Sequence, residues 1–284
     1  MTAPAELREF LMSRRAAIDP ALVGLPASQR PRRRPGLRRE EVAALAGVSV
    51  DYYARLEQGR AGNVSDQVLA AIADALCLDD LEREHLRTLV AAKPTARRKP
   101  GRTVRKGVRA SVRTLIDSMH GTPAMVQGPR MEILAANRAM RVLLTDFEAM
   151  PAVERNIARW LFLAPEAKAR YPQWEEVAAS TVAALRAARD PRLPDEALER
   201  LVGELSVASA QFAKFWSDYR LFKHEYGRKQ FFHDSVGELT LNYDTLPIPG
   251  TDGQILCAYT PDPGSPSEEK LSLLLSWSDL TASR

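Results

Sequence analysis

Residues 36–60 read GLRREEVAALAGVSVDYYARLEQGR, and this stretch decides the fold of the front of the chain. Its apolar residues recur at helical spacing up to Ala46, and Gly47 suits the left-handed conformation that ends a helix. Ser49 then provides the N-cap of a second helix, which Gly59 ends. Two helices joined by so tight a turn predict a helix-turn-helix.

Helical spacing continues on both sides of this stretch. Leu7, Phe10 and Leu11 share one face of an expected first helix. Two more apolar faces begin near Val64 and Leu81. Five short helices with short turns predict an all-α domain.

Basic residues are unevenly placed along the 284 residues, whose net charge is +4. Residues 93–113 carry nine Lys or Arg and no acid, and the prolines, glycines and charges of residues 93–107 predict a linker. Six arginines lie between Arg30 and Arg39. We interpret them as an arm along DNA phosphates or in the minor groove, with a solvated loop as the alternative.

The pattern changes after the linker. Residues 124–127 and 131–134 flank Gly-Pro-Arg and predict a hairpin, and residues 238–243 and 254–259 predict two further strands, with Phe231 to His233 as a candidate third. Helices are expected over residues 108–119, 137–144, 155–162, 174–188, 194–219 and 271–277. This order predicts an α+β domain, with helices against an antiparallel sheet. The expected domains are therefore 1–92, the linker 93–107, and 108–284.

Composition excludes several classes of protein. The chain is 45% hydrophobic and 27% charged, which is ordinary for a globular protein, and its two cysteines and four histidines have no metal-ligand spacing. No apolar run approaches the ~18 residues that span a bilayer, and the N-terminus does not resemble a signal peptide. No nucleophile elbow, phosphate loop or zinc-protease motif occurs. We therefore expect a cytoplasmic protein with no metal, no membrane contact and no enzymatic activity.

The helix-turn-helix pattern resembles the XRE-type, lambda-repressor-like DNA-binding domain over residues 6–92. The resemblance implies a recognition helix in the major groove of double-stranded DNA, opened by Ser49. Val50 and Asp51 depart from the amide side chains that are frequent in the family at these positions. From their own chemistry, Val50 suits contact with a thymine methyl and Asp51 suits a hydrogen bond from cytosine N4. Arg55 reads guanine or contacts a phosphate, with a solvated helix face as the alternative. For Asp51 the alternative is a first-turn acid favoured by the helix dipole. The predicted DNA-binding residues are Arg33, Arg34, Arg38, Arg39, Ser49, Val50, Asp51, Tyr52, Arg55, Arg60 and Asn63.

Sequence strings after the linker indicate a particular subgroup of these regulators. The strings TPAMVQGPRMEILAANRAM (122–140) and GRKQFFHDSVGELTLNYDTL (227–246) are similar to those of MmyB-like regulators, in which a PAS-like ligand-binding domain follows the helix-turn-helix. The resemblance implies a sensor whose pocket holds a fatty acid or similar amphiphile, and a homodimer.

Aromatic and polar residues between 137 and 243 are the candidates for the ligand pocket, because such pockets combine apolar walls with a few polar anchors. Arg159 and Arg186 are candidate clamps for a ligand carboxylate, with pairing to Glu175 or Glu176 as the alternative. For the aromatic residues, the alternative is ordinary core. The predicted ligand-binding residues are Asn137, Arg159, Trp160, Phe162, Trp174, Arg186, Phe212, Phe215, Trp216 and Tyr243.

The leading hypothesis is a sequence-specific DNA-binding transcription regulator gated by a small-molecule effector. The alternative is a regulator whose back domain serves dimerisation or partner recruitment without a metabolite. A third reading, an enzyme tethered to DNA, has no catalytic motif in its favour.

Overall fold

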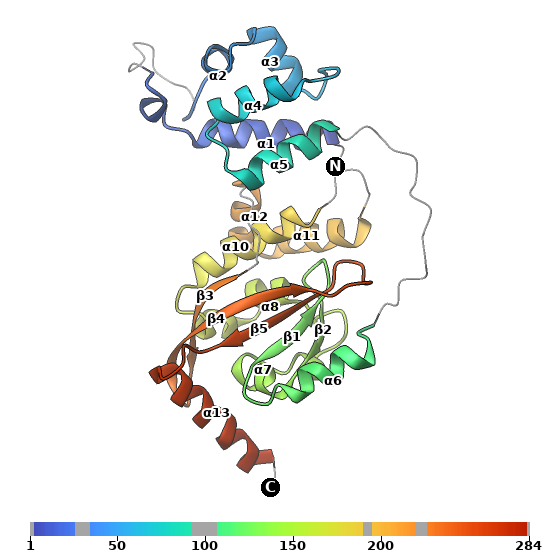
Figure 1. Cartoon of the computed structure of the whole chain (residues 1–284), viewed down its shortest axis with the longest axis vertical. Helices are drawn as coiled ribbons and strands as arrows, with labels where there is room; N and C mark the ends of the chain where they lie inside the picture. Colours follow the sequence, from blue (N-terminus) through green and yellow to red (C-terminus); the bar gives the residue numbers. More distant parts are fainter. Residues whose placement is uncertain (1–2, 26–34, 92–106, 190–194, 220–225, 283–284) are drawn as a thin grey trace. The chain divides into compact units, whose positions relative to one another are not determined.

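Contacts in the computed structural model divide the chain into two units (Figure 1). The structure describes residues 3–25, 35–91, 107–189, 195–219 and 226–282. We define unit 1 as the described residues up to Ala91, with Arg189, Asp195, Glu196 and residues 217–219, and unit 2 as the other described residues. Unit 1 thus includes residues that the sequence assigned to the back domain, and nearly all of the expected linker lies outside the described residues.

Unit 1 is helical throughout its described elements. They are α1 (Ala3–Ala17), the short 3-10 helix η1 (Pro20–Val23), α2 (Arg39–Leu45), α3 (Val50–Glu57), α4 (Asp66–Ala75) and α5 (Asp80–Ala91). The five α-helices are those that the sequence predicted. Helices of this length are marginally stable in isolation. Each of the five buries one apolar stripe in the domain core, and this packing stabilises it.

The core of unit 1 collects side chains from all five α-helices. Phe10 and Leu11 of α1, Tyr53 of α3, Ile72 of α4 and Leu86 of α5 are at most 1% exposed. Burying an apolar side chain of this size stabilises a fold by ~1.5–3 kcal/mol. This shared core fixes the position of α3, the predicted recognition helix.

Unit 2 combines helices with a sheet. Its described elements are α6 (Ala110–Ser118), β1 (Ala124–Gln127), β2 (Ile133–Ala136), α7 (Arg138–Leu143), η2 (Phe147–Ala149), α8 (Ile157–Leu163), α9 (Pro165–Arg170), α10 (Trp174–Ala187), α11 (Glu196–Ala208), α12 (Ala210–Ser217), β3 (Tyr226–His233), β4 (Gly237–Pro247), β5 (Ile255–Thr260) and α13 (Pro266–Ala282). Across the described ranges, no helix is both long enough and apolar enough to cross a membrane.

The sheet has the strand order β2-β1-β5-β4-β3, and every neighbouring pair is antiparallel. Side chains alternate between its two faces. Val126 and Leu256 pack with Ile116 of α6 on one face, whereas Met125 and Cys257 join the main core, to which α7, α8, α9, α10 and α13 contribute. The predicted α+β arrangement is therefore confirmed.

Four elements differ clearly from the sequence prediction. The helix expected over residues 194–219 is two helices, because the Ser209 hydroxyl accepts a hydrogen bond from the Phe212 amide at 3.2 Å and starts α12. The last helix begins at Pro266 rather than Leu271, and α9 was not predicted. The candidate strand at Phe231 to His233 is the end of the longer β3.

Candidate functional site

The turn between α2 and α3 has the geometry that its sequence predicted. Gly47 adopts φ 65°, and the Val48 amide donates back to the Ala43 carbonyl at 3.0 Å. Ser49 is the N-cap of α3, and its hydroxyl accepts from the Tyr52 amide at 3.1 Å. An N-cap of this kind stabilises a helix by ~1 kcal/mol and fixes where α3 begins.

The two sides of α3 differ sharply in exposure. Tyr53 and Leu56 lie in the core, whereas Val50, Asp51 and Arg55 are exposed. Of the other predicted DNA-binding residues on or after this helix, Ser49, Arg60 and Asn63 are exposed and Tyr52 is half-buried. The exposed side of α3 thus brings the predicted base-reading side chains together, although their contacts with DNA stay a prediction.

Arg39 has a partner that sequence reasoning missed. Its Nε and Nη2 donate to Oε1 of Glu57 at 3.1 and 2.7 Å, and Nε of Arg15 lies 3.4 Å from the other Glu57 oxygen. The Glu57 side chain is 0% exposed, and its hydrogen bond raises the pKa of Arg39. Glu57 therefore fastens α3 to α1 and α2, and the role of Arg39 as a phosphate contact stays a prediction for a side chain that is 43% exposed.

The other predicted arginines near α2 divide into two groups. Arg38 is the N-cap residue of α2, and its amide donates to Oε2 of Glu41 at 2.6 Å. Its guanidinium lies 3.5 Å from Oε1 of Glu40. Arg33 and Arg34 lie outside the described residues.

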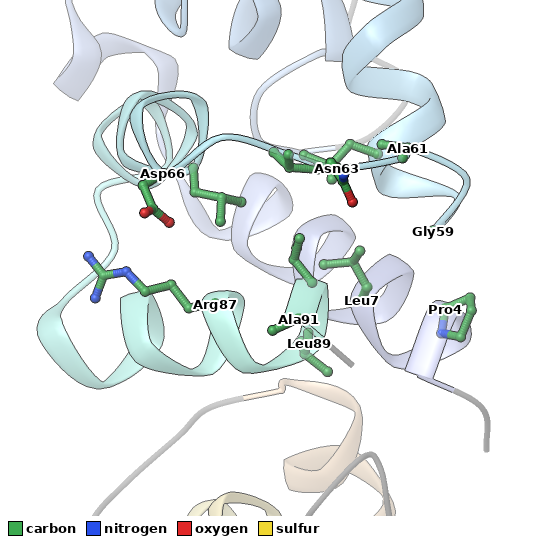
Figure 2. Close-up of a pocket in the computed structure, with 14 residues that line it drawn as sticks. Pro4, Leu7, Gly59, Ala61, Asn63, Asp66, Arg87, Leu89 and Ala91 are labelled. Atoms are coloured by element: carbon green, nitrogen blue, oxygen red, sulfur yellow. The ribbon is translucent and has the colours of Figure 1, made fainter. Parts of the chain in front are cut away.

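A hollow of about 750 Å³ lies in unit 1 beside the end of α3 (Figure 2). It is bordered by Leu7 of α1, by Arg87 and Leu89 of α5, and by the loop that carries Ala61 and Asn63. Asn63 thus belongs to the rim of a hollow as well as to the exposed residues after α3.

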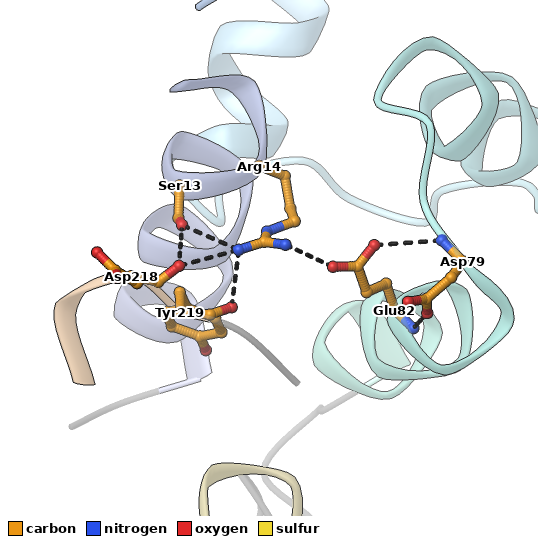
Figure 3. A network of polar contacts seen from close by, with 6 residues as sticks. All are labelled: Ser13, Arg14, Asp79, Glu82, Asp218 and Tyr219. Atoms are coloured by element: carbon orange, nitrogen blue, oxygen red, sulfur yellow. Dashed lines mark hydrogen bonds and ion pairs between the residues drawn. The ribbon is translucent and has the colours of Figure 1, made fainter. Parts of the chain in front are cut away.

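Residues 217–219 pack within unit 1 (Figure 3). Nη2 of Arg14 donates to the carbonyls of Asp218 and Tyr219 at 2.9 and 3.1 Å, and its Nη1 donates to Glu82 at 2.6 Å. The Tyr219 side chain is buried, and its ring centroid lies 5.6 Å from that of Phe10. Tyr219 adopts φ 51°, a left-handed conformation that costs a non-glycine residue ~1–2 kcal/mol and that the surrounding contacts must outweigh.

Unit 2 has a small cavity between its sheet and helices α8 and α10. Its volume of about 20 Å³ has room for about one water molecule, whereas ligand pockets measure ~300–1,000 Å³. The lining residues are Met125, Gln127, Met131, Ile157, Leu161, Tyr171, Val177, Thr181, Lys229 and Tyr259. A larger ligand therefore requires these side chains to move apart, which the flexible methionines favour.

Lys229 is a charged residue on the inner face of β3. It alternates with exposed residues and shares its face with buried Phe231. Its Nζ lies 4.6 Å from the ring centroid of Tyr243 and 5.8 Å from that of Tyr259. Burial of the ammonium group lowers the pKa of Lys229 to about 8, and burial raises the pKa of the neighbouring Cys257 to about 12.

Lys229 was absent from the sequence predictions, although a signal for it exists. Once Phe231 is placed inward, the period of two along a strand places Lys229 inward as well. Gly227, two residues before Lys229, leaves room for the Tyr243 ring. A Cβ there would lie 3.0 Å from ring atoms of Tyr243.

Four of the predicted ligand-binding residues lie in or beside the main core. The side-chain amide of Asn137 donates to three backbone carbonyls, and its oxygen accepts from the amides of Ala124 and Met140 at 3.0 and 2.9 Å. Trp174 donates to the Leu161 carbonyl at 3.0 Å. Trp160 and Tyr243 belong to the same core. Asn137 therefore anchors β1 and α7, with its amide and its oxygen both engaged.

The other six predicted residues lie at a second cluster around α8, α10, α11 and α12. Phe162 packs edge-on against Phe212 with ring centroids 5.1 Å apart, and Phe215 and Trp216 adjoin them. Arg186 stacks on Trp216 at 4.0 Å and donates to its carbonyl. Arg159 pairs with Glu204 of α11 rather than with the acids of α10 that the sequence offered.

The predicted pocket residues and the cavity are neighbours rather than the same set. None of the ten predicted residues, all of which the structure describes, lines the cavity. Met131 connects the two places, because it lines the cavity and also packs against the second cluster. Ligand contacts by the ten residues stay a prediction.

A helix-turn-helix with an exposed recognition helix, in one chain with an α+β unit, is the arrangement of a DNA-binding regulator with a second domain. Sequence profiles agree with this class. The profile of a helix-turn-helix domain matches residues 29–86, and that of the MmyB-like transcription regulator ligand binding domain matches residues 108–274. The chain belongs to this MmyB-like family, as its sequence motifs predicted. Neither profile describes an enzyme, and no curated protein matches the chain.

Proposed function

We propose that the protein is a cytoplasmic, sequence-specific transcription regulator that binds double-stranded DNA and senses a fatty acid or similar amphiphile. The observation that carries the DNA-reading role is the exposed side of α3, where Val50, Asp51 and Arg55 lie on a helix fastened by Glu57. In the major groove, Arg55 pairs with guanine and Val50 contacts a thymine methyl.

We propose that the protein acts as a homodimer. Two recognition helices related by a two-fold axis read half-sites about one DNA turn apart. Leu273 and Trp277 of α13 support dimerisation through unit 2, because they are four residues apart on one helix face and are 43% and 44% exposed.

The cavity and the second aromatic cluster support the sensor role. The ligand tail separates Met131 from its neighbours and extends from the cavity toward Phe162 and Phe215. The chain then carries the change to unit 1, because Ser217 ends α12 and Tyr219 packs against Phe10. Regulation is a population shift between two states of the protein that differ in the arrangement of residues 217–219. The ligand must therefore bind the protein in one of these states more tightly than in the other.

A second candidate function has one observation in its favour. The cavity of about 20 Å³ is far smaller than an amphiphile, as expected if unit 2 serves dimerisation or partner recruitment without a metabolite.

Native mass spectrometry of the purified full chain separates the two candidates. We expect a dimer that carries an adduct of fatty-acid mass, which an added fatty acid of different mass displaces. Two outcomes support the second candidate and contradict the sensor role. In one, the added fatty acid displaces the adduct from no copy of the protein. In the other, the dimer carries no adduct even at saturating fatty acid.

A further inference from the structure

We propose that Lys229, Tyr171 and Tyr259 form an anion site that binds the carboxylate head group of the ligand inside unit 2. This inference rests on the proposed sensor function and adds the chemistry of the ligand's polar end, which none of the ten predicted ligand residues provides at the cavity.

Three residues with donor groups, from separate parts of unit 2, line the cavity. Lys229 comes from β3, Tyr259 from β5 and Tyr171 from the residue after α9. Burial raises the pKa of both tyrosines, so their hydroxyls remain protonated donors. An ammonium with two hydroxyls is the complement of a group that only accepts hydrogen bonds.

The surroundings favour an anion over a neutral group. The described lining of the cavity includes Lys229 and no carboxylate. A buried ammonium beside aromatic rings gains part of its stabilisation from the ring faces, here Tyr243 at 4.6 Å. A bound carboxylate adds a full opposite charge at a site where little water screens it.

The size of the cavity selects a carboxylate over a phosphate. A volume of about 20 Å³ takes roughly one water, so a planar carboxylate enters with smaller displacements than a tetrahedral phosphate. The apolar side chains of Ile157, Leu161 and Val177 also line the cavity and suit the first methylenes of a chain.

Binding at this site must depend on pH, since the ligand needs the ammonium form of Lys229. Among the described residues, the titratable groups placed near it are Tyr243 on β4, Cys257 and Tyr259 on β5, and Tyr171 after α9. Helices α8 and α10 contribute Ile157, Leu161, Val177 and Thr181, which do not titrate. Burial lowers the pKa of Lys229 to about 8, so affinity for a carboxylate falls as the pH rises above that value.

The test compares dodecanoate, dodecanol and dodecyl phosphate as probes of the full chain by calorimetry. The two anions are used below their micelle concentrations and dodecanol below its solubility limit. Lys229→Met keeps the length of the side chain and removes its charge. Arg228→Met is the matched control, because it removes one charge from the next residue of β3, on the exposed side. We expect Lys229→Met to weaken dodecanoate about 10- to 100-fold, the loss of one charge-assisted interaction, with little effect on dodecanol.

The outcomes separate this inference from the proposed function. Wild type and Arg228→Met must bind dodecanoate more tightly than dodecyl phosphate, and more weakly at pH 9.5 than at pH 7.5, whereas Lys229→Met shows no such pH change. Equal dodecanoate affinity in all three proteins overturns the anion site while amphiphile sensing stands. Tighter dodecyl phosphate binding overturns the choice of a carboxylate. Failure of every probe to bind wild type contradicts the sensor function as well.

Discussion

Replacing Glu57 with glutamine tests whether the DNA-reading helix is held by a buried charge. Glu57 lies at the end of α3 and reaches guanidinium groups from α1 and α2. Glutamine has nearly the same shape but no charge. We therefore expect Glu57→Gln to loosen α2 and α3 without opening a cavity.

The contacts of Glu57 set the size of the effect. The carboxylate accepts two hydrogen bonds from Arg39 and lies 3.4 Å from Arg15. Removing one partner of a fully buried pair costs ~3–5 kcal/mol. Because the Arg39 side chain is 43% exposed, water compensates part of this loss, and we expect about 2–3 kcal/mol.

Hydrogen exchange of the α2 and α3 amides, followed by mass spectrometry in sub-denaturing urea, measures the free energy of local opening. This readout avoids treating two units as one transition. Glu40→Gln is the control, because its side chain is 64% exposed and its ion pair with Arg38 is worth under about 0.5 kcal/mol. Equal effects of the two substitutions would refute the account of Glu57.

Four further predictions concern other residues. In fluorescence anisotropy, Arg55→Ala should weaken binding to a selected DNA site more than binding to random DNA, by ~1–3 kcal/mol, and equal losses on both duplexes contradict a base-reading role. Arg33→Ala should weaken binding to both duplexes and reduce the slope of log affinity against log salt concentration by about one. An unchanged slope contradicts a phosphate contact by Arg33. Tyr219→Ala should destabilise unit 1 by about 3 kcal/mol in exchange of the α1 and α5 amides, and unchanged exchange rejects the packing role. Between pH 8 and 9 the unfolded chain holds more protons at Lys229 than the folded chain, so its contribution makes the free energy of unfolding rise with pH. In urea titrations Lys229→Met should lose that slope relative to wild type, and parallel curves contradict it.

The sequence predicted the elements whose signals are local. Gly47 and Ser49 mark the ends of two helices by conformation and by capping, and both do so in the structure. The break at Ser209 was missed because serine is also tolerated inside helices, and only the hydrogen bond to Phe212 distinguishes a cap. α9 was missed because its six residues are too few to show a helical period.

The candidate site was harder to predict than the helices and strands, because it depends on contacts between residues that are distant in the sequence. Exposure of Val50, Asp51 and Arg55 follows from the period of α3 and was predictable. The pairing of Arg39 with Glu57 joins residues 18 apart, and their sequence spacing does not reveal that they meet. Tyr219 packs in unit 1 and accepts a hydrogen bond from Arg14, more than 200 residues earlier in the chain. No local sequence pattern indicates this contact.

The central claim is that an amphiphile changes how this protein binds a particular DNA sequence. The most direct test selects a duplex from a random pool and measures the affinity of the full chain for it, against a scrambled duplex, at one fixed salt concentration with and without dodecanoate. We predict at least about a 1,000-fold preference for the selected duplex, and a change in that affinity when dodecanoate saturates the protein. Equal affinity for both duplexes, or an affinity that dodecanoate leaves unchanged although it binds, contradicts the claim.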